Sequence, residues 1–239
     1  TQRFYEGVLA GKDAAMDGAD LTPACKACEH SIPDSADIAL GLWGVDTGVG
    51  ILAQAQSPAG EALLNQLSLP AAEVPPARKE VLAQLLESRT ACRDQMFADT
   101  AAATNSVEKL GNYMANCVNC YNCRVACPVC YCKECVFVTD VFNHDPAQYL
   151  RWAQRKGAVK MPTDTVFYHL TRLTHMSTAC VGCGQCSNAC PNDIPVMELF
   201  RLIGHRTQEA FAYEAGKSVE ENPPLSVFKE DEFQEVVGL

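Results

Sequence analysis

The chain has 239 residues, enough for one large or two small domains with a modest core, and its formal net charge is −10. This acidic balance argues against nucleic-acid binding, because proteins that bind phosphate backbones carry a basic stripe. Eleven of the 14 cysteines fall between Cys117 and Cys190, mostly in Cys-x-x-Cys spacing, which suits a metal better than disulfides. With neither a leader peptide nor a membrane-spanning apolar run, the sequence predicts a reducing, cytoplasmic setting.

Residues 1–75 predict a small β-containing segment. The apolar stretch 41–52, Gly41-Leu-Trp-Gly-Val-Asp-Thr-Gly-Val-Gly-Ile-Leu, indicates short strands with turns. A helical connector is expected over 76–116. Its first helix follows Pro75-Pro76, has apolar residues at helical spacing and continues to about Phe97. Its second helix starts at Asn105, which forms a capping-box pair with Glu108.

Residues 117–217 predict a cysteine-rich domain with a helical insertion at 136–179. Within the insertion, Asp145-Pro146 begins a helix through Trp152, and Pro162-Thr163 begins another. A last helix is expected from Ile194 to about Tyr213, followed by an extended acidic tail at 218–239. The basic cluster is either a solvated helix face or a docking patch. It consists of Arg151, Arg155, Lys156 and Lys160.

Two runs share the pattern C-x2-C-x2-C-x3-C-P. They are Cys117-Val-Asn-Cys120-Tyr-Asn-Cys123-Arg-Val-Ala-Cys127-Pro128 and Cys180-Val-Gly-Cys183-Gly-Gln-Cys186-Ser-Asn-Ala-Cys190-Pro191. In bacterial ferredoxins the first three cysteines of such a run bind one [4Fe–4S] cluster and the fourth binds the other. The pattern therefore predicts one cluster on Cys117, Cys120, Cys123 and Cys190, and a second on Cys180, Cys183, Cys186 and Cys127.

The predicted fold class is thus α+β: a small β-containing N-terminal segment, then a mainly helical bacterial-ferredoxin-like 2[4Fe–4S] domain. Structural zinc is the alternative, although zinc does not call for a third Cys and a Pro in each run. Gly182 and Gly184 would let backbone N–H groups approach the sulfurs. Because every corner of such cubes is bound by protein, the predicted chemistry is one-electron relay without a catalytic residue.

The remaining cysteines predict a third metal centre. Cys25, Cys28, Cys132 and Cys135 supply four thiolates, with Cys130 as a substitute ligand for Cys132. Four thiolates suit either a further cubane or a tetrahedral zinc, and a relay favours the cubane. Cys92 is expected to be an ordinary free thiol. The five histidines form no metal-binding motif, so each is expected to be structural, and no dinucleotide or P-loop fingerprint occurs.

Two stretches resemble the iron–sulfur β subunit of formate dehydrogenases, within the coenzyme F420-reducing hydrogenase/dehydrogenase β family. One is 116–137, with Cys-Pro-Val-Cys-Tyr-Cys-Lys-Glu-Cys; the other is 168–180, Tyr-His-Leu-Thr-Arg-Leu-Thr-His-Met-Ser-Thr-Ala-Cys. Cys25-Lys-Ala-Cys28, followed by Ala36-Asp37-Ile38, is a further match. The resemblance covers most of residues 23–216 and supports the third cluster.

The resemblance implies electron transfer between a molybdenum or tungsten formate dehydrogenase catalytic subunit and an acceptor such as a heterodisulfide-reductase-type flavoprotein. The family's flavin-binding domain would precede residue 1, so FAD is not expected in this chain. Two alternatives remain open. The segment Ile194-Pro-Val-Met-Glu-Leu-Phe200 is similar to the ferredoxin-like C subunit of heterodisulfide reductases, and a hydrogenase-type β subunit would reduce coenzyme F420.

Overall fold

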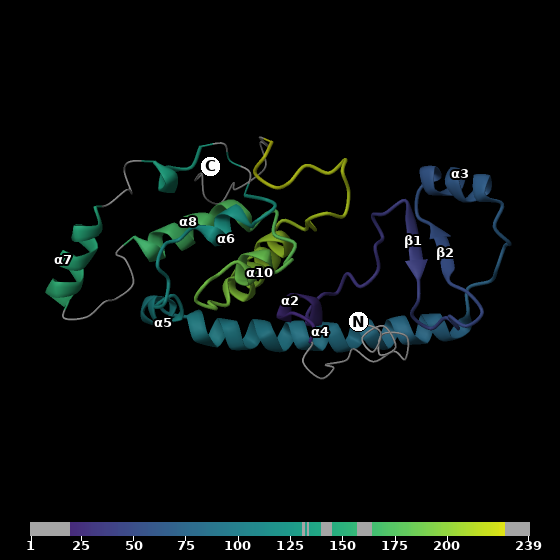
Figure 1. Cartoon of the computed structure of the whole chain (residues 1–239), viewed down its shortest axis with the longest axis horizontal. Helices are drawn as coiled ribbons and strands as arrows, with labels where there is room; N and C mark the ends of the chain where they lie inside the picture. Colours follow the sequence, from purple (N-terminus) through teal and green to yellow (C-terminus); the bar gives the residue numbers. More distant parts are fainter. Residues whose placement is uncertain (1–19, 131, 133, 140–144, 157–163, 228–239) are drawn as a thin grey trace, which may run out of the picture. The chain divides into compact units, whose positions relative to one another are not determined.

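The computed structural model describes residues 20–130, 132, 134–139, 145–156 and 164–227. The chain packs into two compact units, 1–99 and 100–239, and the boundary between them falls within the long helix α4 (Pro76–Thr104; Figure 1). Helices predominate, and the described residues contain one sheet, of two strands. The predicted class, α+β with a mainly helical ferredoxin-like part, is confirmed. The finer division at residues 75, 116 and 217 remains a prediction.

The sheet of the first unit pairs β1 (Ile38–Gly41) with β2 (Leu52–Ala55) in antiparallel fashion, so that the last residue of β1 lies opposite the first of β2. The strands therefore meet the predicted stretch 41–52 only at its ends. Its interior forms turns, one of them closed by a hydrogen bond from the Val49 N–H to the Asp46 carbonyl. The prediction of strands within this stretch is wrong because Gly and Asp favour turns.

Two short helices of the first unit were not expected from the apolar pattern. They are α2 (Pro23–Lys26) and α3 (Pro58–Leu67). Each begins with a hydroxyl N-cap followed by proline, Thr22 for α2 and Ser57 for α3, which is a strong local start signal. The helix predicted to end near Phe97 continues to Thr104, because its last turns are rich in alanine, the best helix former.

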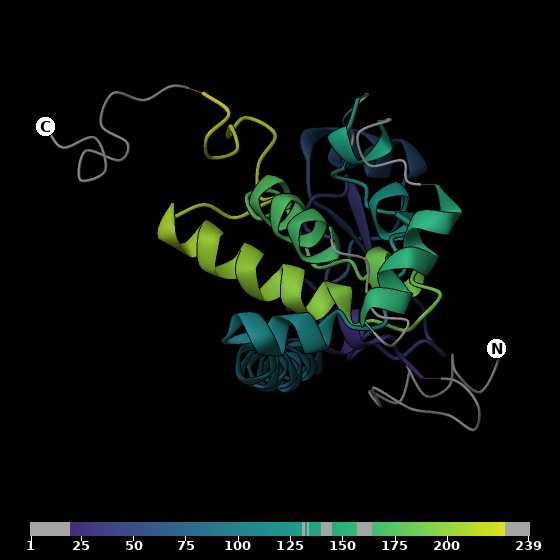
Figure 2. The same cartoon turned by 90° about the vertical axis from the view of Figure 1, so that its left-hand side faces the viewer.

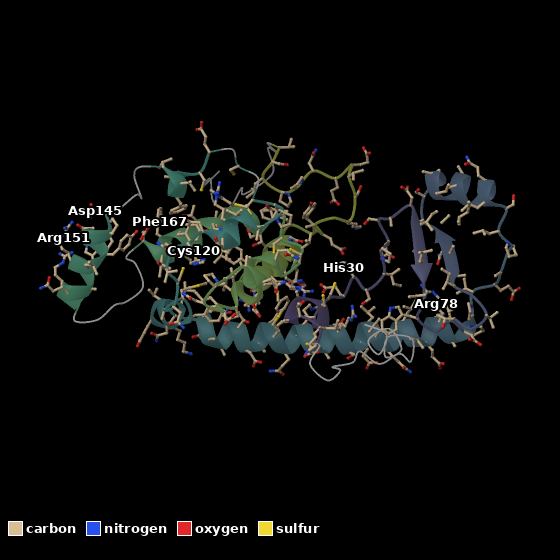
Figure 3. The ribbon with its side chains drawn as sticks, in the orientation of Figure 1. His30, Arg78, Cys120, Asp145, Arg151 and Phe167 are labelled. Carbon is tan, nitrogen blue, oxygen red and sulfur yellow. The ribbon has the colours of Figure 1, made fainter. Side chains whose placement is uncertain are left out.

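Side chains from α4 hold the loops of the first unit in place. Arg78 is buried (Figure 3) and donates a hydrogen bond to the Trp43 carbonyl at 3.0 Å. Gly44 has φ +66°, and a Cβ there would lie 2.4 Å from the Arg78 Cα, so this close approach requires glycine. Further along α4, Arg93 pairs with Glu29 at 3.3 Å and thereby fixes the segment that follows α2.

The second unit is built from helices around a core. In chain order these are α5 (Val107–Tyr113), α6 (Asn122–Val125), the 3₁₀ turn η1 (Val136–Val138), α7 (Pro146–Lys156), α8 (Thr165–Met176), α9 (Gln185–Asn188) and α10 (Val196–Ala210). Helix α10 packs against α8 (Figure 2) and also against α9, and α6 packs against α9. The buried core consists of Met114, Leu173, Met176, Ile194, Val196, Leu199 and Phe200.

The observed bounds correct several predicted ones. Ser106, not Asn105, caps α5, since its hydroxyl accepts from the Lys109 N–H at 3.2 Å. Helix α7 extends past Trp152 to Lys156, whereas Pro162-Thr163 lies outside the described residues. Helix α10 is shorter than predicted because Pro195 restricts the residue before it and the left-handed Ala212 lies just beyond the helix end.

The predicted tail and the predicted basic cluster are only partly covered by the described residues. The described portion of the tail, 218–227, has no helix or strand, and 228–239 lies outside. Arg151 and Arg155 are exposed on α7, and Lys160 lies outside the described residues. Within the described ranges, no helix combines the length and the apolar character needed to cross a membrane.

Candidate functional site

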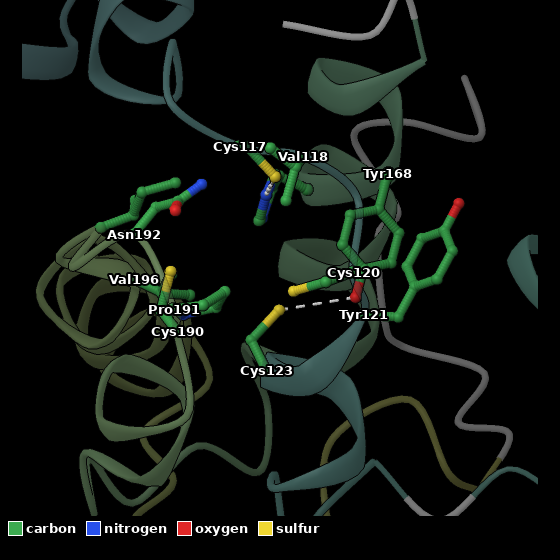
Figure 4. Close-up of a pocket in the computed structure, with 12 residues that line it drawn as sticks. Cys117, Val118, Cys120, Tyr121, Cys123, Tyr168, Cys190, Pro191, Asn192 and Val196 are labelled. Carbon is green, nitrogen blue, oxygen red and sulfur yellow. Dashed lines mark hydrogen bonds between the residues drawn. The ribbon is translucent and has the colours of Figure 1, made fainter. Parts of the chain in front are cut away.

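Four cysteines of the second unit surround one pocket. Cys117, Cys120 and Cys123 come from the first run and Cys190 from the second, and their sulfur atoms face the same hollow (Figure 4). The hollow measures about 340 Å³, part of it open to solvent, and Val118, Ile194 and Val196 form its apolar wall. These are the four cysteines that the spacing assigns to one cluster.

Electrostatics also show that these thiols are close neighbours. Burial raises the pKa of Cys117 to about 11, and the thiolate charges of Cys123, Cys120 and Cys190 add to that rise. Thiolates crowded together in this way repel one another unless a cation stands between them. The arrangement therefore favours binding of a positively charged metal centre.

Among the described residues, no three His, Cys, Asp or Glu side chains converge closely enough to hold a single metal ion.

Three cysteines of the second predicted set, Cys127, Cys180 and Cys186, pack against the core of the second unit. Burial raises the pKa of Cys186 to about 12, and the charges of Cys180 and Cys127 contribute. Burial likewise raises the pKa of Cys180, with contributions from Cys127 and Cys183. Cys127 of the first run thus lies among the cysteines of the second run, while Cys190 of the second run lies among those of the first. Two neighbouring sets of four thiols result, each drawing one member from the other run.

The two runs have the same backbone conformation. Asn119 and Tyr121 have φ of 52° and 60°, and the equivalent Gly182 and Gly184 have φ of 66° and 79°. The backbone N–H of Asn119 lowers the pKa of Cys117, and the backbone N–H of Gly182 lowers the pKa of Cys180. Donors aimed at sulfur stabilise thiolates and tune iron–sulfur centres.

Helix α8 points three polar side chains at the cysteines. The Tyr168 hydroxyl lies 3.5 Å from the Cys123 Sγ, and the His169 Nε2 lies 3.4 Å from the Cys117 Sγ. Arg172 Nη1 donates to the Cys123 Sγ at 3.1 Å. Burial and the charge of Arg172 lower the pKa of His169 to about 4, so its ring is neutral.

The expectation that every histidine is structural stays a prediction, although His169 touches a proposed ligand. The signal for these three residues was their spacing, i, i+1 and i+4, which places them along one side of a helix. The three residues lie in the 168–180 stretch that carries the family resemblance, and α8 begins three residues before it.

The cysteines of the predicted third centre lie in different units. Cys25 and Cys28 belong to the first unit and Cys132 and Cys135 to the second, so the third centre remains a prediction. Cys130, the substitute ligand, packs against the core of the second unit near Arg172 and Cys127.

Residues 174–196 match the family model of the 4Fe-4S binding domain, a range that contains the whole second run. The two sets of thiols fit that cofactor, because thiolates are the ligands that [4Fe–4S] clusters use. The molecule is an iron–sulfur protein of the electron-transfer class. The number of its clusters stays a prediction from the cysteine spacing.

The chain is similar to proteins named as beta subunits of F420-dependent formate dehydrogenases. It is 28% identical over 200 residues to the F420-dependent formate dehydrogenase subunit beta of Methanocaldococcus jannaschii, an alignment that covers 80% of this chain and 48% of the relative. It is also 28% identical over 212 residues to the F420-dependent formate dehydrogenase 1 subunit beta of Methanococcus maripaludis, covering 84% and 50%. The chain thus spans about half the length of the curated relatives it matches, and the resemblance seen in the sequence is confirmed.

Proposed function

We propose that this chain is the electron-transfer subunit of a formate dehydrogenase complex and holds two [4Fe–4S] clusters. The ligands would be the two sets of thiols described above, Cys117, Cys120, Cys123 and Cys190 for one and Cys180, Cys183, Cys186 and Cys127 for the other. The observation that carries the proposal is the pocket that the first set lines, because its four cysteines come from two runs about 60 residues apart in the sequence, as the ferredoxin pattern requires.

When bound, such clusters supply one-electron transfer and offer no open iron to a substrate. The protein's part is to hold and insulate them. Helix α6 carries Cys123 into the first set, and the chain then delivers Cys127 to the second set within one further turn, so the two centres are neighbours. The apolar wall of the pocket limits water, and the donors from α8 fix the orientation of the thiolates.

The partners we propose follow from the names of the relatives and from the sequence resemblance. Electrons would enter from a molybdenum or tungsten subunit that oxidises formate. They would leave to a flavoprotein, such as a heterodisulfide-reductase-type subunit.

The test is to purify the native complex without oxygen through a tag on this chain, and to measure its molybdenum and tungsten content. Formate is then added while the visible absorbance of the iron–sulfur clusters is followed. We expect one of the two metals, together with formate-dependent bleaching. A complex that keeps its iron but contains neither metal, and whose clusters formate does not bleach, would overturn the proposal.

A second candidate acceptor is coenzyme F420, because both relatives carry this dependence in their names. The same purified complex distinguishes the two acceptors. Formate-dependent reduction of added F420 would favour F420, whereas reduction of a co-purifying flavoprotein alone would favour the heterodisulfide-reductase-type acceptor.

A further inference from the structure

Arg172 is a buried cation whose contacts are with cysteines. Its side chain is 3% exposed, and besides the bond to the Cys123 Sγ its Nη2 donates to the Cys123 carbonyl at 3.1 Å. The guanidinium carbon stands over the rings of Phe200 at 4.7 Å and Tyr168 at 5.6 Å. These contacts fix the charge in place, since two hydrogen bonds and two aromatic faces leave a guanidinium little freedom.

The charge of Arg172 has no carboxylate partner among the described residues. Burying an unpaired charge is costly, so the compensating negative charge has to come from elsewhere. The Cys123 Sγ lies 3.1 Å from the Arg172 Nη1, and Cys130 packs against the same core as Phe200, over whose ring the guanidinium stands. The sulfur-rich surroundings therefore take the place of an acidic partner.

The same charge reaches both sets of thiols. Cys123 belongs to the first set, while Cys127 and Cys186 of the second set pack against the core that contains Phe200, the ring over which the Arg172 guanidinium stands. The Nε of Arg172 is buried and has no hydrogen-bond partner among the described residues. Buried donors without a partner are rare in native proteins. The Arg172 Nε is therefore available to an acceptor bound between the two sets of thiols.

We propose that Arg172 is a shared positioning residue, a fixed positive charge between the two clusters that raises the reduction potential of both. Reduction adds one negative charge to a cluster, and a nearby buried cation stabilises that added charge because the interior screens it weakly. Hydrogen bonds to ligand sulfur act in the same direction. This inference rests on the cluster assignment of the proposed function.

The test compares three variants of the full chain in its complex, prepared without oxygen. Arg172→Gln removes the charge, and Arg172→Lys keeps it but loses the planar fork. Arg206→Gln removes a charge from the exposed Arg206 on α10 and serves as the matched control. Iron content and visible absorbance are recorded first, and the midpoint potential of each cluster is then measured by redox titration followed by electron paramagnetic resonance.

We expect Arg172→Gln to make both midpoints more negative by at least a tenfold change in the one-electron equilibrium, about 59 mV. Arg172→Lys should recover part of this shift, and Arg206→Gln should cause none. Unchanged midpoints in an Arg172→Gln protein with full iron would overturn the inference, and a shift in one cluster alone would overturn its shared character. Lack of clusters in the unaltered protein would instead overturn the proposed function.

A second measurement covers the case in which the Arg172 variants lose iron. The unaltered protein is labelled with ¹⁵N-arginine and reduced, and pulsed resonance is used to look for nitrogen coupled to the cluster of Cys123. We expect a coupled arginine nitrogen, because Arg172 Nη1 lies 3.1 Å from that ligand sulfur. Absence of coupling would contradict the proposed contact.

Discussion

At Asn119, Tyr121, Gly182 and Gly184 the backbone takes the left-handed conformation, and these four positions are equivalent in the two runs. Glycine adopts it without strain, whereas an aromatic residue such as Tyr121 rarely does. The strain is held in place by contacts, since the Tyr121 ring packs edge-on against Tyr168 at 4.9 Å. Strained positions of this kind cluster at functional sites, here directly beside the thiols.

Gly182→Ala is expected to destabilise the second unit. The positive φ alone costs roughly 1–2 kcal/mol for a residue with a Cβ, and that Cβ would lie 2.5 Å from the Arg201 Cδ. The control is Gly111→Ala in α5, where a Cβ meets nothing within 4 Å and should stabilise the helix by about 0.5–1 kcal/mol. Urea unfolding of the anaerobic protein measures both, and equal effects of the two changes would contradict the argument.

The cysteines of the two sets could be predicted from spacing because each run is short and local. Tyr168, His169 and Arg172 could not be assigned to the site in the same way. They lie 45, 52 and 49 residues from the cysteines they contact, and only the packing of α8 brings them there. The sequence predicted a helix in this insertion but not the side of it that faces the thiols.

At the scale of elements, the second unit contains one structural element twice. Each run ends in a short helix, α6 or α9, and these two helices pack together. After each run the same turn follows, with the Cys130 N–H bonded to the Cys127 carbonyl and the Asp193 N–H to that of Cys190. The repeat could be predicted from the cysteine pattern. The position of the β-strands could not, because each strand is short and the most conspicuous apolar stretch in this region forms the turn between them.

Helix α10 packs against α9 and α8. Shortening a buried side chain of α10 should therefore destabilise the second unit. Leu199 is 3% exposed and belongs to the core, and we expect Leu199→Ala to cost about 2–5 kcal/mol. Val219→Ala, at a position 98% exposed, should change stability little. The readout is the urea midpoint of the anaerobic protein. A Leu199→Ala midpoint as high as that of Val219→Ala would show that α10 is not part of the stabilising core.

At the scale of the whole molecule, the open question is how many metal centres the chain holds. For the predicted third centre the first unit would supply Cys25 and Cys28, and its packing is ordered around them, since Thr22 caps α2 and Arg93 ties Glu29 to α4. A segment fixed on both sides of a Cys-x-x-Cys pair is suited to present two thiolates to a metal. The second unit would supply Cys132, which is exposed, and Cys135.

Iron and zinc analysis of the anaerobic protein decides between the alternatives. On four irons per cluster, three clusters give about 12 iron atoms per chain and two give about 8. We expect about 12, falling to about 8 in a Cys25→Ser/Cys28→Ser double variant and staying at about 12 in Cys92→Ser, whose thiol is exposed on α4. About 8 irons with one zinc in the unaltered protein would replace the third cluster by a zinc site, and the double variant would then lose the zinc and keep its iron.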